Sequence, residues 1–379
     1  MSTTHNGKLT EPLTFKHGAT ISSRIAMAPM EVYASETNGN IGEDSLNFYS
    51  KRSRAAGLII TGASSVNLAG KAFDRQIGIT SDENLPGLNK LAKTLKKDGN
   101  KAVIQLHHGG REAATAQNQF GRALAPSKID FPFLNYVPDE MTEAEIEQTI
   151  ADFGAAATRA IKAGFDGVEI HGANHYLLQQ FFSAYSNHRT DHWGGSLEKR
   201  MNFPLAVTKA VMEATKDAVK DGFIVGYRFS PEEIHGDNVG YTINESLQLI
   251  DKLLTEFDLD YIHASLFGGY NEKPVNGNTS IGEMLKATVG DRAKTIVVGG
   301  ITNAELAEKA LAYGDIVAIA REALVEPEFA GKILSGDEDK IVSTITKDNA
   351  DTLGLTKDLK NWFTMSGSPL PPLPGAENF

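Results

Sequence analysis

The chain has 379 residues, no cysteine and a formal net charge of −11, with 37 Lys and Arg against 48 Asp and Glu. These values exclude disulfides, cysteine nucleophiles and thiolate-held iron–sulfur clusters, and they argue against nucleic acid or an anionic membrane as a partner. No apolar run approaches the roughly 20 residues that span a bilayer, and the polar start "MSTTHNGKLTEP" lacks a signal-peptide core, so we expect a soluble cytoplasmic protein.

Eight short apolar runs follow one another along the chain, and a helical pattern follows each of them. Most are too apolar to have a wet face, as is typical of parallel strands covered by helices. The runs are "RIAMAP" (24–29), "GLIITG" (57–62), "AVIQL" (102–106), "GVEIH" (167–171), "FIVGYRF" (223–229), "YIHAS" (261–265), "TIVVGG" (295–300) and "DIVAIA" (315–320). Eight strand–helix units predict an α/β fold of the (β/α)8 TIM barrel type, with a doubly wound open sheet as the competing architecture.

The chain is longer than a minimal barrel, and no break in composition indicates a second domain. We therefore predict one domain over residues 1–379, with a barrel core at about 20–335 and a C-terminal extension over 336–379. Further extensions are expected at the N-terminus, in loop 3 (107–140) and in loop 6 (266–280). The final "SPLPPLPGAENF" is predicted to be extended rather than helical.

Three predicted helix starts carry a capping box, in which a Thr hydroxyl is followed three residues later by a Glu carboxylate. The pairs are Thr142 with Glu145, Thr242 with Glu245, and Thr302 with Glu305. The helix after Thr142 is predicted to end near Gly164.

In such barrels the chemistry lies where the strands end in loops. Gln105 is an amide inside the third apolar run. Because a buried amide is costly without partners, Gln105 is either a satisfied core residue or a donor and acceptor for a heterocycle. Arg228 ends the fifth run, and in a dry strand interior it calls for an anion or a polarised carbonyl.

The last two strands end in residues suited to a phosphate group. Gly299 and Gly300 follow the seventh run, and Ala320 and Arg321 end the eighth. Loops 7 and 8 of a (β/α)8 barrel commonly form a phosphate cradle, through close backbone approach and exposed N–H groups. The chain contains neither GxxxxGK[ST] nor GxGxxG, so P-loop and Rossmann nucleotide binding are not indicated.

The stretch "EIHGANHY" (169–176) concentrates polar groups at the end of the fourth run. His171 and Asn174 are three residues apart, so their N–H donors could converge on one ligand oxygen and stabilise negative charge there. Tyr176 could then present its phenol to the other end of the same ligand as a proton donor.

Two histidine pairs have a spacing that can hold zinc on a helix, namely His171 with His175 and His188 with His192. Neither pair includes the glutamate of an HExxH motif, and the strand ends lack the His and Asp expected of a metal-dependent barrel hydrolase. We therefore predict no metal site, and packing roles for His175, His188 and His192.

The sequence over roughly residues 10–335 resembles the old yellow enzyme family of FMN-dependent ene-reductases. The most specific match is "GFDGVEIHGANHYLLQQFFSAYSNHRTDHWGGSLEKR" (164–200). Further matches are "RIAMAPM" (24–30), "QLHHGGRE" (105–112), "VVGGIT" (297–302) and "DIVAIAREALVEPEFAGK" (315–332). The fold of that family is the barrel that the alternation predicts.

The resemblance implies FMN as the cofactor and NADH or NADPH as the reductant. It places Ala28, Pro29, Met30, Glu31, Ala63, Gln105 and Arg228 on the flavin ring, and Gly299, Gly300, Ala320 and Arg321 on the phosphate. Glu31 stands where relatives have Thr or Cys. It either holds its proton and donates to the ring or turns away to pair with a cation.

The resemblance also implies the reaction. An α,β-unsaturated carbonyl compound would take a hydride from flavin N5 while His171 and Asn174 bind its oxygen and Tyr176 supplies a proton. Tyr33 matches a tyrosine of the substrate pocket, and a homo-oligomer is compatible with the family. Two alternatives stay open: an NADH oxidase with oxygen as acceptor, and a non-redox phosphate-binding barrel of the aldolase or isomerase type.

Overall fold

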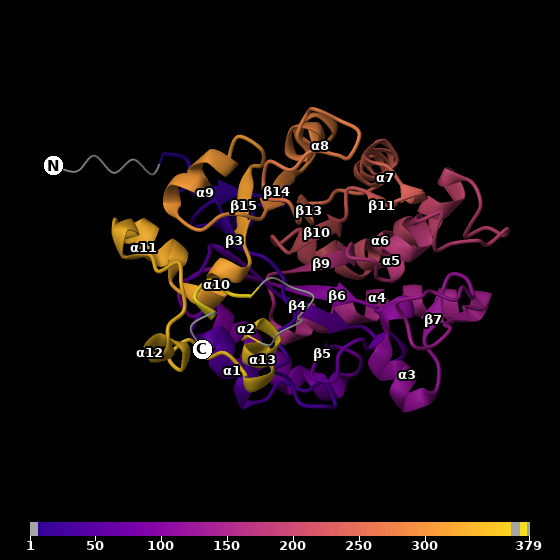
Figure 1. Ribbon diagram of the computed structural model, residues 1–379, viewed down its shortest axis with the longest axis horizontal. Helices are drawn as coiled ribbons and strands as arrows, with labels where there is room; N and C mark the ends of the chain where they lie inside the picture. The colour runs from indigo at the N-terminus through magenta and orange to yellow at the C-terminus, as the bar shows by residue number, and fades with distance from the viewer. Residues whose placement is uncertain (1–6, 365–371, 377–379) are drawn as a thin grey trace.

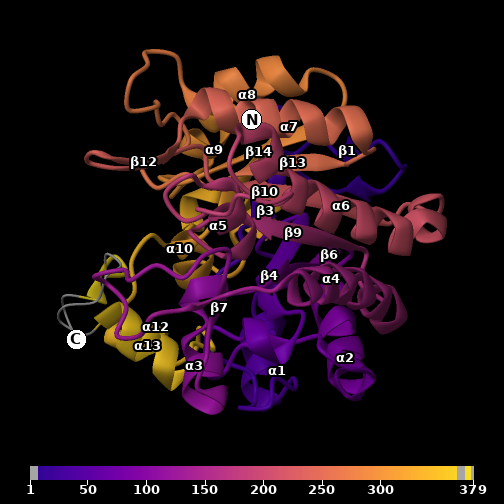
Figure 2. The ribbon, with the colours of Figure 1, turned by 90° about the vertical axis from the view of Figure 1, so that its right-hand side faces the viewer.

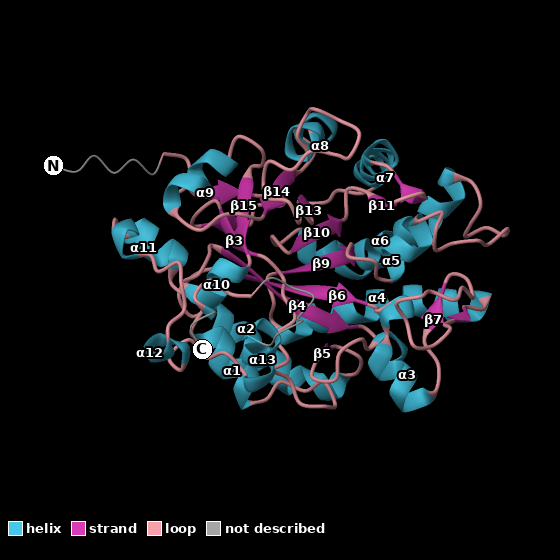
Figure 3. Cartoon of the chain, in the orientation of Figure 1, coloured by secondary structure: helices cyan, strands magenta, loops and turns pink. Residues whose placement is uncertain are grey.

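Eight parallel strands close into a barrel at the centre of the molecule, with helices outside them (Figure 1 and Figure 3). The computed structural model describes residues 7–364 and 372–376. The barrel strands are β3 (Ile25–Met27), β4 (Leu58–Ser65), β6 (Lys101–His107), β9 (Gly167–Gly172), β10 (Ile224–Phe229), β13 (Tyr261–Ala264), β14 (Lys294–Val298) and β15 (Ile316–Ile319). Strand β3 pairs with both β15 and β4, which closes the ring. The predicted barrel is therefore confirmed, and the open sheet is wrong. Strand β5 (Ile77–Gly78) pairs with β4 alone.

Each barrel strand is followed by at least one helix, as the alternation predicts. The helices are α1 (Glu43–Ser50), α2 (Leu85–Lys96), α3 (Ala114–Phe120), α4 (Glu143–Ala163), α5 (Leu177–Phe182), α6 (Leu197–Val219), α7 (Ile243–Glu256), α8 (Ile281–Val289), α9 (Ala304–Ala310), α10 (Arg321–Val325), α11 (Phe329–Ser335), α12 (Lys347–Ala350) and α13 (Lys357–Thr364). In the described part of the chain, none of them combines the length and the apolar character needed to cross a membrane.

Helix boundaries follow the local capping chemistry. The capping boxes predicted at Thr142 and Thr242 are present, and Gly164 ends α4 in a left-handed conformation with φ 83°. The box predicted at Thr302 is wrong, because Asn303 is the N-cap and its side chain accepts a hydrogen bond from the first turn of α9. Asn is among the best N-cap residues, so it takes the position in preference to the threonine before it.

The predicted extensions contain short elements of their own. Hairpin β1–β2 (Leu13–Thr14 and Thr20–Ile21) lies at the N-terminal end, and loop 3 holds α3 and the pair β7–β8 (Leu124–Ala125 and Asp139–Glu140). Loop 5 contains a hairpin that was not predicted, β11–β12 (Glu233–His235 and Asn238–Tyr241), which projects from the body of the molecule in Figure 2.

The C-terminal extension returns to the start of the chain. Figure 1 shows α12 and α13, in yellow, beside the N-terminal helices in indigo and purple. Of the final segment predicted to be extended, residues 368–371 and 377–379 lie outside the described residues. Residues 372–376 form a turn instead, closed by a hydrogen bond of 2.9 Å from the Ala376 N–H to the Leu373 carbonyl.

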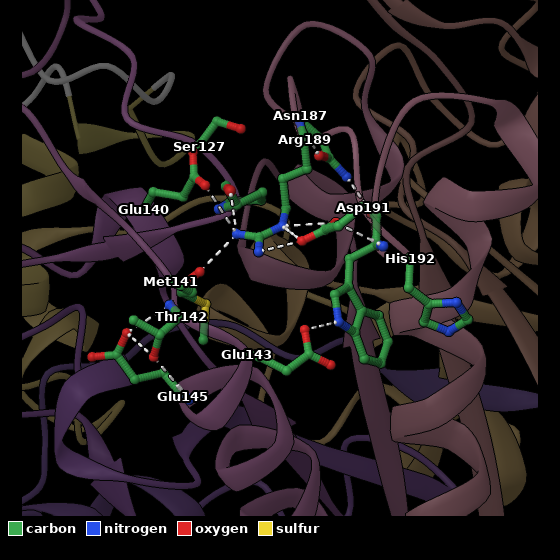
Figure 4. A network of polar contacts seen from close by, with 12 residues as sticks. Ser127, Glu140, Met141, Thr142, Glu143, Glu145, Asn187, Arg189, Asp191 and His192 are labelled. Atoms are coloured by element: carbon green, nitrogen blue, oxygen red, sulfur yellow. Dashed lines mark hydrogen bonds and ion pairs between the residues drawn. The ribbon is translucent and has the colours of Figure 1, made fainter.

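A buried arginine joins loop 3 to the segment between α5 and α6 (Figure 4). The Arg189 side chain is 7% exposed and donates to the carbonyls of Pro126 at 3.1 Å and Met141 at 2.6 Å. It also pairs with the Asp191 carboxylate at 2.6 Å. Because charge-assisted hydrogen bonds are stronger than neutral ones, this network holds loop 3 against the segment that follows the fourth barrel strand.

Candidate active site

The register of the parallel strands places the polar residues at the carboxyl end of the barrel next to one another. Arg228 in β10 lies opposite His171 in β9 and His263 in β13. Gln105 in β6 lies opposite Ala63 in β4 and Glu169 in β9. The predicted flavin-ring residues Ala63, Gln105 and Arg228 are therefore brought to the same end of the barrel as His171.

A buried glutamate that the sequence analysis missed links these strands. Glu169 is fully buried, and its carboxylate accepts hydrogen bonds from Gln105 Nε2 at 2.6 Å and from His263 Nδ1 at 2.8 Å. Burial opposes its ionisation, but His263, Arg228 and Gln105 together hold the pKa of Glu169 below its ordinary value. An acid inside the apolar run "GVEIH" was the available signal, by the reasoning applied to Gln105.

Several buried polar atoms near the barrel mouth have no hydrogen-bond partner among the described residues. They include Arg228 Nε, His107 Nε2, His263 Nε2 and Glu31 Oε2. Burial lowers the pKa of the Arg228 guanidinium, and the Glu169 carboxylate partly restores it. Since buried polar groups in proteins are nearly always hydrogen-bonded, these atoms suit a planar ligand that carries both donors and acceptors.

The segment after β3 runs along this mouth. The N–H of Ala28 continues the barrel pairing by donating to the Ile319 carbonyl at 2.9 Å, and Pro29 and Met30 follow it. A Cβ at Gly62 in β4 would meet the Met30 carbonyl oxygen at 2.4 Å, so β4 and this segment pack backbone to backbone.

Glu31 ends this segment in an unusual environment. Its Oε1 accepts hydrogen bonds from the backbone N–H groups of Val32 at 3.0 Å and Tyr33 at 2.9 Å. Burial raises the pKa of Glu31 to about 8, against the opposing effect of those N–H groups and of Lys71. No ion pair joins Glu31 to a cation within residues 7–364 and 372–376. The expectation that it pairs with a cation is therefore wrong, and a carboxyl that keeps its proton near neutral pH fits the geometry.

Two glycines shape the end of β14. Gly299 and Gly300 have φ of 106° and 71°, and a Cβ on Gly299 would meet the Gly269 Cα at 2.9 Å. Only glycine adopts such angles at little cost. The next strand, β15, is followed by Ala320, the N-cap residue of α10, and by the exposed Arg321, which donates to the Pro372 carbonyl at 3.4 Å. The four predicted phosphate residues thus lie at the ends of two paired strands.

Hydrogen bonds fix His171 and Asn174 as donors. The Nδ1 atom of His171 accepts from the Ala173 N–H at 3.2 Å, which leaves the ring proton on Nε2. Burial lowers the His171 pKa well below its ordinary value, so the ring stays neutral. Asn174 has φ of 56°, and its Oδ1 accepts from the Ser265 hydroxyl at 2.7 Å. Its backbone N–H donates to Ser230 Oγ at 2.8 Å. Because Ser265 takes Oδ1, the group that the Asn174 side chain offers to a ligand is its Nδ2 donor.

Tyr176 packs edge-on against both His107 and His171, with ring centroids 4.3 Å and 5.2 Å away. Burial raises the pKa of its phenol, which therefore keeps its proton at neutral pH. A cavity of about 560 Å³ opens beside Tyr176 and Asn174, and Phe133 of loop 3 forms part of its wall.

The predicted pocket residue Tyr33 meets the C-terminal extension. Its ring centroid lies 5.6 Å from that of Phe73 and 5.7 Å from that of Trp362 in α13. The sequence held no signal for the Trp362 contact, because more than 300 residues separate the two positions. His192 is exposed and packs edge-on against Trp193, as predicted.

Comparison with known proteins identifies the kind of site. The sequence model of the NADH:flavin oxidoreductase / NADH oxidase family matches residues 8–340. The chain belongs to this family. It is an NAD(P)H-dependent flavin oxidoreductase with FMN as cofactor, which confirms the resemblance to old yellow enzymes and excludes the non-redox aldolase or isomerase.

Individual relatives are similar over most of this flavin oxidoreductase. A probable NADH-dependent flavin oxidoreductase of Bacillus subtilis, YqiG, is 43% identical over 89% of the chain and 90% of its own length. An NADH:acrylate oxidoreductase of Vibrio harveyi is 40% identical over 87% of the chain, which spans 33% of that longer protein. The crystal structure of an old yellow enzyme homologue from Zymomonas mobilis has a TM-score of 0.76 at 24% identity, covering 92% of this chain and 99% of that one.

The residues at the barrel mouth fit FMN by their own chemistry. At the end of the barrel that holds Gln105, Arg228 Nε is a donor without a partner among the described residues, and His263 Nε2 is an unpartnered acceptor because Nδ1 donates to Glu169; this combination suits the donors and acceptors at the edge of a flavin ring. Gly299 leaves no room for a side chain, and Gly299 and Gly300 both have positive φ, which suits close approach of a phosphate to the backbone.

The buried histidines of β6 predict how the stability of this flavin oxidoreductase depends on pH. Burial lowers the pKa of His107 and His108 to about 3, whereas both bind a proton below about pH 6.5 in the unfolded chain. The unfolded state therefore binds more protons between these limits, so the free energy of unfolding should fall as pH falls below 6.5, by up to about 1.4 kcal/mol per pH unit for each ring.

Urea unfolding of FMN-saturated protein from pH 5 to 8 measures this slope. His108→Gln should reduce it by about 1.4 kcal/mol per pH unit, whereas His192→Gln, at an exposed position, should leave it unchanged. Equal slopes for wild type and His108→Gln would contradict the argument.

Proposed function

We propose that this flavin oxidoreductase reduces the C=C bond of α,β-unsaturated carbonyl compounds, and that His171 and Asn174 bind the carbonyl oxygen. The observation that carries this proposal is that both side chains are fixed as donors, through the Ala173 N–H and the Ser265 hydroxyl. Preorganised donors stabilise charge that develops on an oxygen, and one such donor is typically worth about 3–4 kcal/mol. Polarising the carbonyl in this way makes the β-carbon electrophilic.

The cofactor would be held by residues at the ends of six strands, β3, β4, β6, β10, β14 and β15. When bound, FMN carries two electrons from NADH or NADPH to the substrate as a hydride. We assign Ala28, Pro29, Met30, Glu31, Ala63, Gln105 and Arg228 to its ring, and Gly299, Gly300, Ala320 and Arg321 to its phosphate. The positive charge of Arg228, supported by Glu169, would stabilise a reduced ring that gains negative charge.

Tyr176 is our candidate for the proton donor. Its phenol keeps its proton at neutral pH, and its ring lies against His171, so it would reach the same substrate that His171 polarises. Tyr33, held between Phe73 and Trp362, would form a wall of the substrate pocket.

The name of one relative supports an α,β-unsaturated compound as the electron acceptor, whereas the family description also allows oxygen. The Vibrio harveyi relative is named for acrylate, an α,β-unsaturated acid, although this chain spans only a third of that protein. Oxygen is the second candidate acceptor, because the family description includes NADH oxidases.

Paired substitution of the oxyanion donors tests the proposal. After anaerobic reduction by NADH or NADPH, His171→Ala/Asn174→Ala should be reoxidised by enones at least about 10²-fold more slowly than wild type. Reoxidation by oxygen should change little, because oxygen needs no carbonyl polarisation. His192→Ala is the control. Wild-type reoxidation by oxygen alone would favour the oxidase, and unchanged enone rates in the double variant would remove both residues from the role.

Tyr176→Phe separates the two half-reactions. Reduction of the cofactor by NADH or NADPH needs no proton from Tyr176 and should stay within about twofold of wild type. Reoxidation by a poorly activated enone should slow by about 10²-fold or more, the usual contribution of a positioned acid. Stopped-flow absorbance of the flavin follows both steps, and equal slowing of the two would mean that Tyr176 only shapes the pocket.

Glu31→Gln tests the protonated carboxyl. Because the pKa of Glu31 is about 8, the substitution should leave the flavin midpoint potential unchanged well below pH 8 and raise it above pH 8. There the wild-type carboxylate opposes the negative charge of the reduced ring, and a like-charge pair at about 4 Å costs roughly 4 kcal/mol at an effective dielectric near 20. Glu36→Gln, at an exposed position, is the control. A constant offset at all pH values would show that Glu31 does not titrate in this way.

A further inference from the structure

A second polar cluster lies at the edge of the cavity beside Tyr176. One ligand atom from each of His175, Glu233 and His235 lies within 4.8 Å of the others. His175 and His235 also line the cavity, and their ring centroids are 5.2 Å apart. None of the three has a place in the flavin chemistry proposed above.

The hairpin in loop 5 brings two of these residues together. Glu233 and His235 are the first and last residues of β11. The pairing of β11 with β12 is irregular between Glu233 and Ile234, and the ligand atoms of Glu233 and His235 lie within 4.8 Å of each other. Gly236 follows with φ of 61° and turns the chain back into β12. Glu233 is buried at 1% exposure, whereas His235 is exposed.

The Glu233 carboxylate is held firmly but without a cation. It accepts hydrogen bonds from Gln179 Nε2 at 2.8 Å and from the Ser183 hydroxyl at 3.0 Å. Within the described residues, no Lys, Arg or His nitrogen lies within 4.0 Å of it. Isolated buried carboxylates are costly, so a positive ion at this position would be stabilised.

His175 reaches the cluster through a left-handed backbone. Its φ is 64°, a conformation that is uncommon for residues other than glycine and often marks a functional position. The Gln179 Oε1 atom accepts from the His175 N–H at 2.9 Å while its amide nitrogen holds Glu233. One side chain therefore positions two members of the cluster, as residues around metal ligands commonly do.

We propose that His175, Glu233 and His235 bind a divalent transition-metal ion, Zn²⁺ by preference, at the edge of this cavity. Two imidazoles and one carboxylate are the donor set of three-ligand zinc sites that keep an open fourth position. Bonds of about 2.0–2.1 Å at a tetrahedral angle put ligand atoms about 3.3 Å apart. The cluster must therefore contract: the half-buried ring of His175 and the exposed ring of His235 must both turn toward the Glu233 carboxylate.

The site differs from the one that the histidine spacing suggested. His171 and His175 are four apart in sequence, but His171 is engaged with the Ala173 N–H. The partners of His175 come instead from a hairpin nearly 60 residues further along the chain. Arg111 is a positive charge that acts on His175. Its Nε atom lies 3.3 Å from the Glu112 carboxylate, with which it forms an ion pair. A bound ion would tie the β11–β12 hairpin to the loop that carries Asn174.

Isothermal titration of the FMN-loaded full chain with Zn²⁺ tests the proposal, using metal-free protein that carries no histidine tag. Wild type should bind one Zn²⁺ per chain in this site. His175→Gly should weaken that binding by at least about tenfold, and because glycine accepts the left-handed backbone this variant should fold at least as well. His235→Ala should show the same loss, and His192→Ala should bind as wild type does.

Co²⁺ gives a readout that does not depend on activity. The chain has no cysteine, so a Co²⁺ absorption band at wavelengths beyond those of oxidised flavin would report nitrogen and oxygen ligands. The band should appear in wild type and His192→Ala and be absent from His175→Gly and His235→Ala. No Zn²⁺ binding by wild type, or equal binding by wild type and His175→Gly, would overturn the proposal.

Discussion

The buried carboxylate of Glu169 is the interaction on which the mouth of the barrel depends. It joins Gln105 in β6 to His263 in β13 across the strands between them, and it supports the charge of Arg228 in β10. Removing one member of a buried charged set typically costs about 3–5 kcal/mol. Because Glu169 takes up one hydrogen bond from each of Gln105 and His263, both side chains are held in place, while Arg228 Nε and His263 Nε2 stay open to a cofactor.

A second constraint acts on the loop after β9. Asn174 and His175 both take left-handed backbone angles, and the loop is held by Ser230, Ser265 and Gln179. These contacts turn neighbouring residues in different directions. Asn174 joins His171 at the proposed oxyanion position, whereas His175 joins the β11–β12 hairpin. A rigid barrel with short, firmly held loops is the usual way to combine stability with a precise site.

Segments distant in sequence meet at Tyr33 and at loop 3. Trp362 of α13 packs on Tyr33, and the Thr356 hydroxyl donates to the Val32 carbonyl at 3.1 Å. On another side, loop 3 is held by Arg189 (Figure 4). In our proposal the C-terminal extension therefore borders the substrate pocket, because Trp362 packs on the proposed pocket residue Tyr33.

The sequence by itself determined the eight barrel strands, their order and the candidate residues at their ends, because apolar periodicity and polar strand ends are local patterns. Of the three helix starts predicted from capping boxes, those at Thr142 and Thr242 are confirmed, and the third is displaced from Thr302 to Asn303. Only the tertiary structure decided the partners of Glu169, the burial that raises the pKa of Glu31, the contact of Trp362 with Tyr33 and the meeting of His175 with Glu233 and His235. Each of these depends on barrel closure, which sets burial and brings together residues that no local pattern connects.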